Sequence, residues 1–231
     1  MLLEKFYITT IDSISWGDSV RERINARSIP NSNDGKDVNI HDIIDSCITN
    51  GIINGDELEQ KLFPHDESHD VFISHSHCDR MDARSLSRKL AEQGISSFID
   101  SNTWCSVYTA LADYQFGDGS RFVDAMKANN EAAHFMLMLN DALKKKISNS
   151  RAFVFIEPSN SIRDGSGFMK ISSPWIRIEL MEAYYFWRYT KKGKEMSKLA
   201  NFSRCCESFE YTVRVDWLEE VKAKELIRLL K

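Results

Sequence analysis

An unbroken apolar run, Val71-Phe72-Ile73, is the feature that most constrains the fold of this chain. A run this short is typical of a parallel strand that is covered on both faces. A helical pattern follows it, with Leu86 and Leu90 on one face, and Gly94 ends that pattern. A second strand is expected over 95–100. A strand, a helix and a strand within about 30 residues form a βαβ unit, so the sequence predicts an α/β fold with a parallel sheet and helices on both faces.

The rest of the C-terminal part alternates between helical and strand-like patterns. A mostly helical stretch is expected at about 101–150, and a third strand over 151–157, ended by Pro158. A further helix begins at Pro174. The alternating run 211–215 predicts a strand with one exposed face, and the last helix covers 226–230.

Residues 1–66 are interpreted as a separate N-terminal helical extension. One predicted helix carries a stripe of isoleucines and is ended by Asn50-Gly51; the stripe consists of Ile40, Ile43, Ile44 and Ile48. A second, short helix through Leu58 ends at Pro64. The predicted domains are therefore the extension, 1–66, and an α/β domain, 67–231, with an enlarged helical insertion at about 101–150.

Composition limits the classes of function. The 231 residues are 42% hydrophobic and carry a formal charge of −4, which suits one core with a small subdomain and does not favour a nucleic-acid partner. We find neither a signal-peptide pattern nor an apolar run near the roughly 20 residues of a membrane span, so we expect a cytoplasmic protein with no membrane partner. Five cysteines without Cys-x-x-Cys spacing predict thiols rather than disulfides.

Ligands of open parallel sheets bind outside the carboxyl ends of the strands, where loops and helix N-termini converge. Three segments are expected to meet there: 74–79, 100–104, and the loop and helix that follow the third strand. The candidate pocket-lining residues come from these segments and are Ser74, His75, Asp100, Trp104 and Trp175.

The helix at Pro174 carries the candidate catalytic group. Ser173 is a plausible N-cap, and proline suits the first helical position because its missing N–H needs no partner there. Trp175 and Glu179 are four residues apart and share a face, so the carboxylate can line a pocket with an aromatic wall. Helix spacing alone favours a solvated glutamate at the margin of an amphipathic helix.

Three ordered motifs resemble those of TIR (Toll/interleukin-1 receptor) domains. They are Asp70-Val-Phe-Ile-Ser-His-Ser-His-Cys-Asp79, Gly94-Ile-x-x-Phe-Ile-Asp100 and Ser173-x-Trp175-x-x-x-Glu179. The resemblance covers roughly residues 69–190 and implies a flavodoxin-like fold. The chain departs from the family in having Ile176 in place of the usual cysteine, and in the long stretch between Asp100 and Ser173.

The resemblance implies chemistry on NAD. Many bacterial and plant TIR domains cleave the nicotinamide–ribose bond, so the chain is expected to be an NAD+ glycohydrolase (an NADase) or an ADP-ribosyl cyclase, with Glu179 as the catalytic carboxylate. NAD is then a substrate, and no cofactor is expected. Resemblance to prokaryotic TIR proteins further implies antiphage defence of the Thoeris type, self-association through TIR domains, and a downstream effector protein that senses a nucleotide product such as cyclic ADP-ribose.

Two other functions are compatible with the sequence. One is a non-catalytic TIR interaction module that acts through TIR–TIR assembly. The other is a nucleotide-sugar or deoxyribosyl transferase, which would also use one glutamate. A metal site is not expected, because the cluster of histidines at 65–77 has no spaced second cluster to complete it. The lysine runs at 144–146 and 191–194 are interpreted as solvated helix ends.

Overall fold

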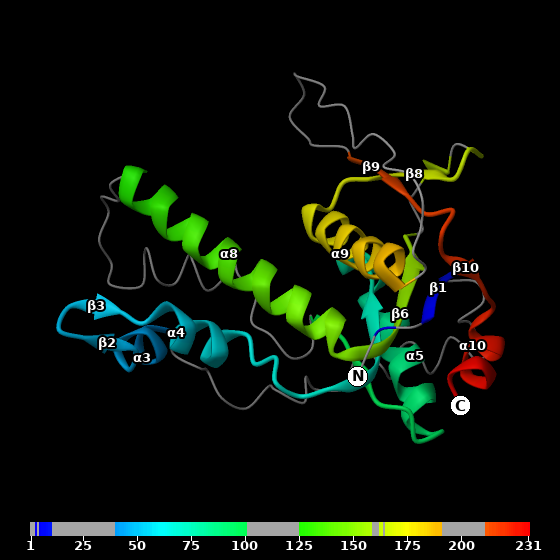
Figure 1. Cartoon of the computed structure of the whole chain (residues 1–231), viewed down its shortest axis with the longest axis horizontal. Coiled ribbons are helices and arrows are strands. Elements are labelled where there is room, and N and C mark those ends of the chain that lie inside the picture. The colour runs from blue at the N-terminus through cyan, green and yellow to red at the C-terminus, as the bar shows by residue number, and fades with distance from the viewer. Residues whose placement is uncertain are drawn as a thin grey trace. The chain divides into compact units, whose positions relative to one another are not determined.

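The computed structural model describes residues 3, 5–10, 40–100, 125–158, 162–163, 165–190 and 211–231 (Figure 1). The chain forms two compact units. The first consists of Met1–Arg27, Ser68–Ile99 and Ile147–Lys231, and the second of Ser28–Glu67 and Asp100–Lys146.

The described part of the first unit is built on a five-stranded sheet in which every adjacent pair is parallel. Its order is β10-β1-β6-β4-β5, and the strands are β1 (Lys5–Thr10), β4 (His69–Ser74), β5 (Ser97–Phe98), β6 (Ser150–Glu157) and β10 (Glu219–Glu220). The predicted parallel α/β sheet is therefore confirmed, with strands at the apolar run 71–73 and at 151–157, whereas the strand expected over 95–100 is limited to Ser97–Phe98.

The position of β1 corrects the predicted domain boundary. Residues 1–66 were expected to form a separate helical extension, but Lys5–Thr10 pairs along its whole length with β6, near the middle of the sheet. Numbered along the chain, the five strands lie in the order 3-2-4-1-5 from the β5 edge. The β5-β4-β6 part has the 2-1-3 arrangement that begins a flavodoxin-like sheet, and β1, the first strand of the chain, lies next to β6. The N-terminal segment thus completes the sheet, because its buried run Phe6-Tyr7-Ile8 needs cover on both faces.

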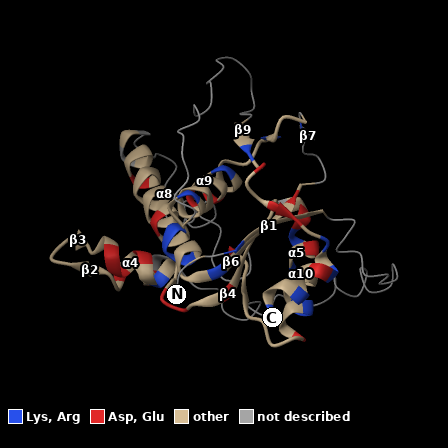
Figure 2. Ribbon diagram, turned by 45° about the vertical axis from the view of Figure 1, so that its right-hand side comes forward, with Lys and Arg blue, Asp and Glu red and all other residues tan. Residues whose placement is uncertain are grey.

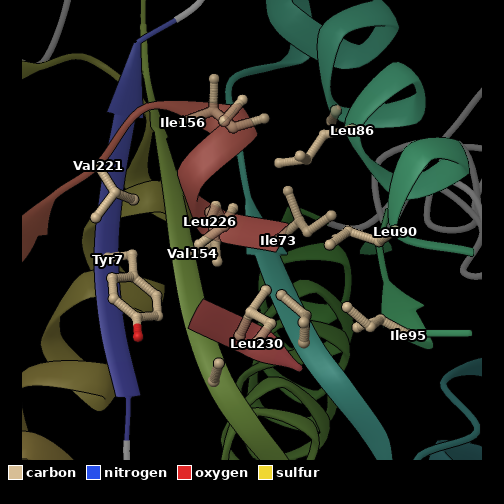
Figure 3. Close-up of a cluster of buried hydrophobic side chains, with 14 of the residues drawn as sticks. Tyr7, Ile73, Leu86, Leu90, Ile95, Val154, Ile156, Val221, Leu226 and Leu230 are labelled. Carbon is tan, nitrogen blue, oxygen red and sulfur yellow. The ribbon is translucent and has the colours of Figure 1, made fainter. Parts of the chain in front are cut away.

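Two helices cover one face of this sheet (Figure 3). They are α5 (Arg80–Ala91) and α10 (Ala223–Leu230). Leu86 and Leu90 of α5 and Leu226 of α10 are fully buried against Ile73 and Val154 of the strands. Because these side chains alternate along the strands with those of the opposite face, both faces are apolar, as a parallel sheet requires.

Helix α9 (Pro174–Thr190) packs on the opposite face. Phe72 and Phe153 stack there at 5.8 Å between ring centroids. Tyr184 of α9 lies edge-on to Trp217 at 5.6 Å, and Trp217 packs in the same way on Phe6 of β1. Helices therefore lie on both faces of the sheet, as predicted.

The predicted strand at 211–215 exists as β9 (Tyr211–Arg214), but it belongs to a small antiparallel sheet with β7 (Ile162–Arg163) and β8 (Phe168–Ile171).

The described part of the second unit contains three helices and one hairpin. They are α3 (Ile40–Asp45), β2 (Ile48–Thr49), β3 (Ile52–Ile53), α4 (Gly55–Leu62) and most of α8 (Ala125–Ser148). The predicted helix through Ile48 is wrong at that residue, because α3 ends at Asp45 and Ile48 pairs with Ile53. Asn50 and Gly51 both have positive φ, 54° and 77°, which is the type I′ turn that joins hairpin strands. Helix α8 confirms the helix expected near 101–150 over 125–148.

Charged contacts join α8 to the segment around α4 within the second unit. Lys145 Nζ lies 2.8 Å from Glu59 Oε1, and Lys146 Nζ donates to the carbonyl oxygen of Glu67 at 2.7 Å. Figure 2 shows the acidic residues of α4 and the basic end of α8. Burial lowers the pKa of Lys146, and the acidic Glu67 and Asp66 oppose that shift.

Among the described helices, none has the length and apolar character needed to cross a membrane.

Candidate functional site

The start of α9 is fixed by its own sequence. Ser173 Oγ accepts a hydrogen bond from Ile176 N at 3.3 Å, and the Ser173 carbonyl accepts one from Arg177 N at 3.2 Å. These contacts satisfy N–H groups that have no partner inside the helix, so Ser173 is the predicted N-cap and Pro174 the first helical residue. The cap sets the rotation of the helix and therefore the direction in which Glu179 points.

Glu179 faces inward from the second turn of α9. Its side chain is buried with Ile176, Leu180 and Ala183 of the same helix, and only 3% of the residue is exposed. Ser74 Oγ donates a hydrogen bond to Glu179 Oε2 at 2.5 Å. The interpretation of Glu179 as a solvated residue at the helix margin is therefore wrong.

The Ser74–Glu179 contact lies at the position where open parallel sheets bind ligands. Ser74 is the last residue of β4, which pairs with β5 on one side and β6 on the other. The chain runs from β4 to β5 and returns across β4 to β6, so the connections change direction at this strand. Such a reversal makes the carboxyl end of β4 a topological switch point, where ligands bind in α/β folds.

Polar residues are buried together in the turn after β4. His75 is buried next to Ser74, and Asp79 is 3% exposed at the end of the short helix η1 (His77–Asp79). Ser76 Oγ donates to the Asp79 carboxylate, and Asp79 N donates back to the Ser76 carbonyl at 2.9 Å. Asp79 was not among the predicted site residues, although it closes the first motif. Its contacts indicate that it fixes the shape of this turn.

The other predicted site residues have different positions. Trp175 is half-buried one turn before Glu179 on α9, as their spacing predicted. Asp100 is half-buried and belongs to the second unit, so it is not grouped with Ser74 in the first. Trp104 lies outside the described residues. The structure thus brings Ser74 and Glu179 together, with His75 adjacent to Ser74 in the chain and Trp175 one helical turn before Glu179.

An arginine joins two strand ends at the same edge of the sheet. Glu157 is the last residue of β6, and its Oε1 accepts a hydrogen bond from Arg163 Nε at 2.8 Å. Arg163 Nη1 also lies 3.2 Å from Glu220 Oε2 of β10. The hydrogen bond to Glu157 raises the pKa of the Arg163 guanidinium further. Sequence patterns did not single out these residues, although Glu157 ends a predicted strand.

The histidines near the first motif do not form a metal centre in the described part of the chain. No group of three or more His, Cys, Asp or Glu side chains is arranged there to hold an ion. His65 Nδ1 instead lies 3.0 Å from the Phe63 carbonyl oxygen, and the His69 ring packs on Phe98 at 5.5 Å. Cys47 and Cys78, the described cysteines, are free thiols.

The geometry around Glu179 suits one kind of chemistry. A carboxylate held in a buried position by a hydroxyl donor supplies a fixed negative charge, which stabilises positive charge that develops on a bound molecule. A carboxylate can also accept hydrogen bonds from hydroxyl groups of a bound molecule. Comparison of the chain with protein-family models, curated proteins and solved structures finds no match in any of the three.

Proposed function

We propose that the chain is a TIR-type enzyme that cleaves the nicotinamide–ribose bond of NAD, with Glu179 as the catalytic carboxylate. The observation that carries the proposal is the burial of Glu179 against Ser74 at the carboxyl end of β4. Burying a carboxylate is costly unless it is hydrogen-bonded, and a module that only bound other proteins would not need one at this position. The parallel sheet, with β4 between β5 and β6 and helices on both faces, also supports a flavodoxin-like TIR fold.

One glutamate suffices for this reaction because the leaving group is already activated. Nicotinamide is bound to ribose as a pyridinium, so when the bond between its nitrogen and ribose C1′ breaks, the electron pair leaves with neutral nicotinamide and no proton is needed. Positive charge then develops on an oxocarbenium-like ribose. Glu179 stabilises that charge and accepts a hydrogen bond from the ribose, and Ser74 holds the carboxylate in orientation.

The group that attacks ribose C1′ decides the product. Attack by water, with loss of a proton, gives ADP-ribose, which is glycohydrolase activity. Attack by a nucleophile within the same molecule gives a cyclic ADP-ribose. His75 and Trp175 are the neighbours proposed to contact the substrate, and Asp100 and Trp104 are proposed on the resemblance alone. The proposed setting is cytoplasmic antiphage defence, in which a nucleotide product activates an effector protein.

Mass spectrometry of the nucleotide products tests this proposal. The concentrated parent protein, Glu179→Gln and a matched control, Glu182→Gln, are incubated with NAD, with and without lysate from phage-infected cells. Glu182 is half-buried on the same helix, so its variant controls for loss of an α9 carboxylate. We expect NAD loss with the parent and Glu182→Gln and not with Glu179→Gln.

The product mass separates hydrolysis from cyclisation. Turnover that persists in folded Glu179→Gln would overturn the role of Glu179. If no protein consumes NAD under either condition and Glu179→Gln assembles like the parent, the chain is a non-catalytic interaction module.

A further inference from the structure

The hairpin of the second unit exposes isoleucine side chains on both of its faces. Ile52 is 72% exposed, and Ile48 and Ile53 are 41% and 40% exposed. Ile48 lies opposite Ile53, whereas Ile52 lies opposite Thr49 and so points to the other face. Exposed apolar residues gathered in one short element indicate an interaction surface rather than a random feature of the exterior.

This hairpin is an ordered element. The type I′ turn at Asn50 and Gly51 matches the twist of paired strands. At its base, Asn54 N donates to the Cys47 carbonyl at 2.9 Å, and the Cys47 side chain is buried with Ile44. Because the base is anchored in this way, the isoleucines are presented in a fixed arrangement.

Acidic residues flank the hairpin on both sides. Asp42 and Asp45 lie on α3 just before it, and Asp56 lies at the start of α4 just after it; all three are exposed. Residues 40–67 hold seven acidic side chains and one lysine. Figure 2 shows the acidic start of α4 beside β2 and β3. A complementary surface should therefore combine apolar area with positive charge.

The chain itself carries such a surface on the last turns of α9. Tyr189 is 84% exposed and Tyr185 is 48% exposed, and their four-residue spacing places the two rings side by side on the helix. Arg188 lies between them in the last turn and supplies the positive charge. Tyrosine and arginine are the residue types enriched in protein interfaces.

We propose that the β2–β3 hairpin of one copy docks on the outer face of α9 of a second copy. Ile52 packs between Tyr185 and Tyr189, and the carboxylates that flank the hairpin attract Arg188. The two surfaces differ, so each copy uses one and leaves the other open, and the contact produces head-to-tail chains. The contact does not depend on the proposed function, but α9 also carries Glu179 on its inner face, which links assembly to the site.

Sedimentation velocity over a range of protein concentrations tests the contact. All variants carry Glu179→Gln and no NAD is present, so a failure of the proposed enzyme activity does not affect the result. Ile52→Asp and Tyr189→Asp are compared with Met126→Asp, a control at an 83% exposed apolar residue of α8. We expect the parent and the control to form larger species as concentration rises, and the two test variants to need about tenfold more protein or to remain monomeric.

Mixing the two test variants gives the sharper result. Ile52→Asp retains an intact α9 face and Tyr189→Asp retains an intact hairpin, so an equimolar mixture should form dimers and nothing larger. Ile52→Ser, a milder change, repeats the test should the aspartate variant lose its circular dichroism spectrum. A parent that stays monomeric at every concentration, an Ile52→Ser protein that assembles like the parent, or a mixture without dimers would overturn the proposal.

Discussion

Ser74 and Glu179 lie 105 positions apart in the sequence, yet the hydroxyl of one donates a 2.5 Å hydrogen bond to the carboxylate of the other. Both residues are almost completely buried. Three features must coincide to produce this contact: the end of β4 at Ser74, the start of α9 at Ser173, and the packing of α9 on the face of the sheet that Ser74 faces. The contact therefore connects the fold directly to the proposed chemistry.

Removal of the Ser74 hydroxyl should slow NAD cleavage without preventing substrate binding. A hydrogen bond to a charged group is worth about 1.5–3 kcal/mol, which corresponds to roughly a tenfold to hundredfold loss in rate. We expect Ser74→Ala to lower kcat by this factor with little change in KM, because the carboxylate loses its orientation. Ser74→Thr keeps the hydroxyl and should restore most of the rate. Equal kcat values for the parent and a folded Ser74→Ala protein would show that Ser74 does not position Glu179.

Loss of the cap of α9 should destabilise the first unit. Ser173→Ala leaves Ile176 N without its acceptor, which typically costs about 1 kcal/mol of unfolding free energy. Urea denaturation, followed by circular dichroism, measures this cost. Ser172→Ala is the matched control, because Ser172 is exposed and precedes the cap. Equal losses in the two variants would argue against the cap.

Substitution of two glycines that have left-handed backbone conformations should show the cost of steric overlap apart from the cost of the backbone conformation itself. Gly165 and Gly167 have φ of 76° and 87°, but a Cβ added at Gly167 would lie 2.6 Å from Asp216 Cβ, whereas one at Gly165 meets nothing within 4 Å. We expect Gly165→Ala to cost about 1 kcal/mol and Gly167→Ala clearly more. Thermal unfolding of the two variants side by side gives the comparison, and a Gly167→Ala protein as stable as Gly165→Ala would contradict it.

The ionisation of Asp70 should make the free energy of unfolding depend on pH. Burial raises the pKa of this carboxyl, but hydrogen bonds from Ser96 N, Ser96 Oγ and Arg151 outweigh that effect and hold the pKa below its ordinary value. The ionised form is therefore stabilised by folding, so its contribution is present at pH values above the ordinary Asp pKa, about 3.9, and is lost as pH falls through the lower folded value.

Asp70→Asn should consequently be less stable than the parent at pH 7, and the difference should shrink as pH falls below about 4. Urea unfolding at pH 7, 5 and 3 measures the free-energy difference at each pH. Asp45→Asn, at an exposed carboxylate, is the control and should show a smaller difference at pH 7. A gap between the parent and Asp70→Asn that is independent of pH would contradict the sign of this shift.

Local patterns were sufficient for part of the fold. The apolar run at β4, the helical stripe of α5 and the cap of α9 each depend on neighbouring residues, and all three were predicted correctly. The hairpin was missed because Ile48 continues the spacing of α3, although Asn50-Gly51 between the β-branched pairs Ile48-Thr49 and Ile52-Ile53 is the stronger signal and predicts a hairpin. The place of β1 depends on pairing with β6, whose partner residues lie 147 positions further along the chain, and no local pattern contains that information.

In the candidate site, too, local sequence predicts some features, and others depend on residues that are distant in the chain. Spacing places Glu179 on the apolar edge of its helix, but its burial depends on Ser74, which is distant in the sequence. Asp100 was expected beside Ser74 because it follows a strand of the same sheet; the chain enters the second unit at that residue.

The release of nicotinamide from NAD by the parent and by Glu179→Gln, measured side by side at equal concentration of folded protein, tests the central claim most directly. We predict steady release by the parent and a loss of at least about a thousandfold in the variant, because the charge that stabilises the ribose cation is gone. Equal release by both proteins would contradict the claim that Glu179 carries the reaction.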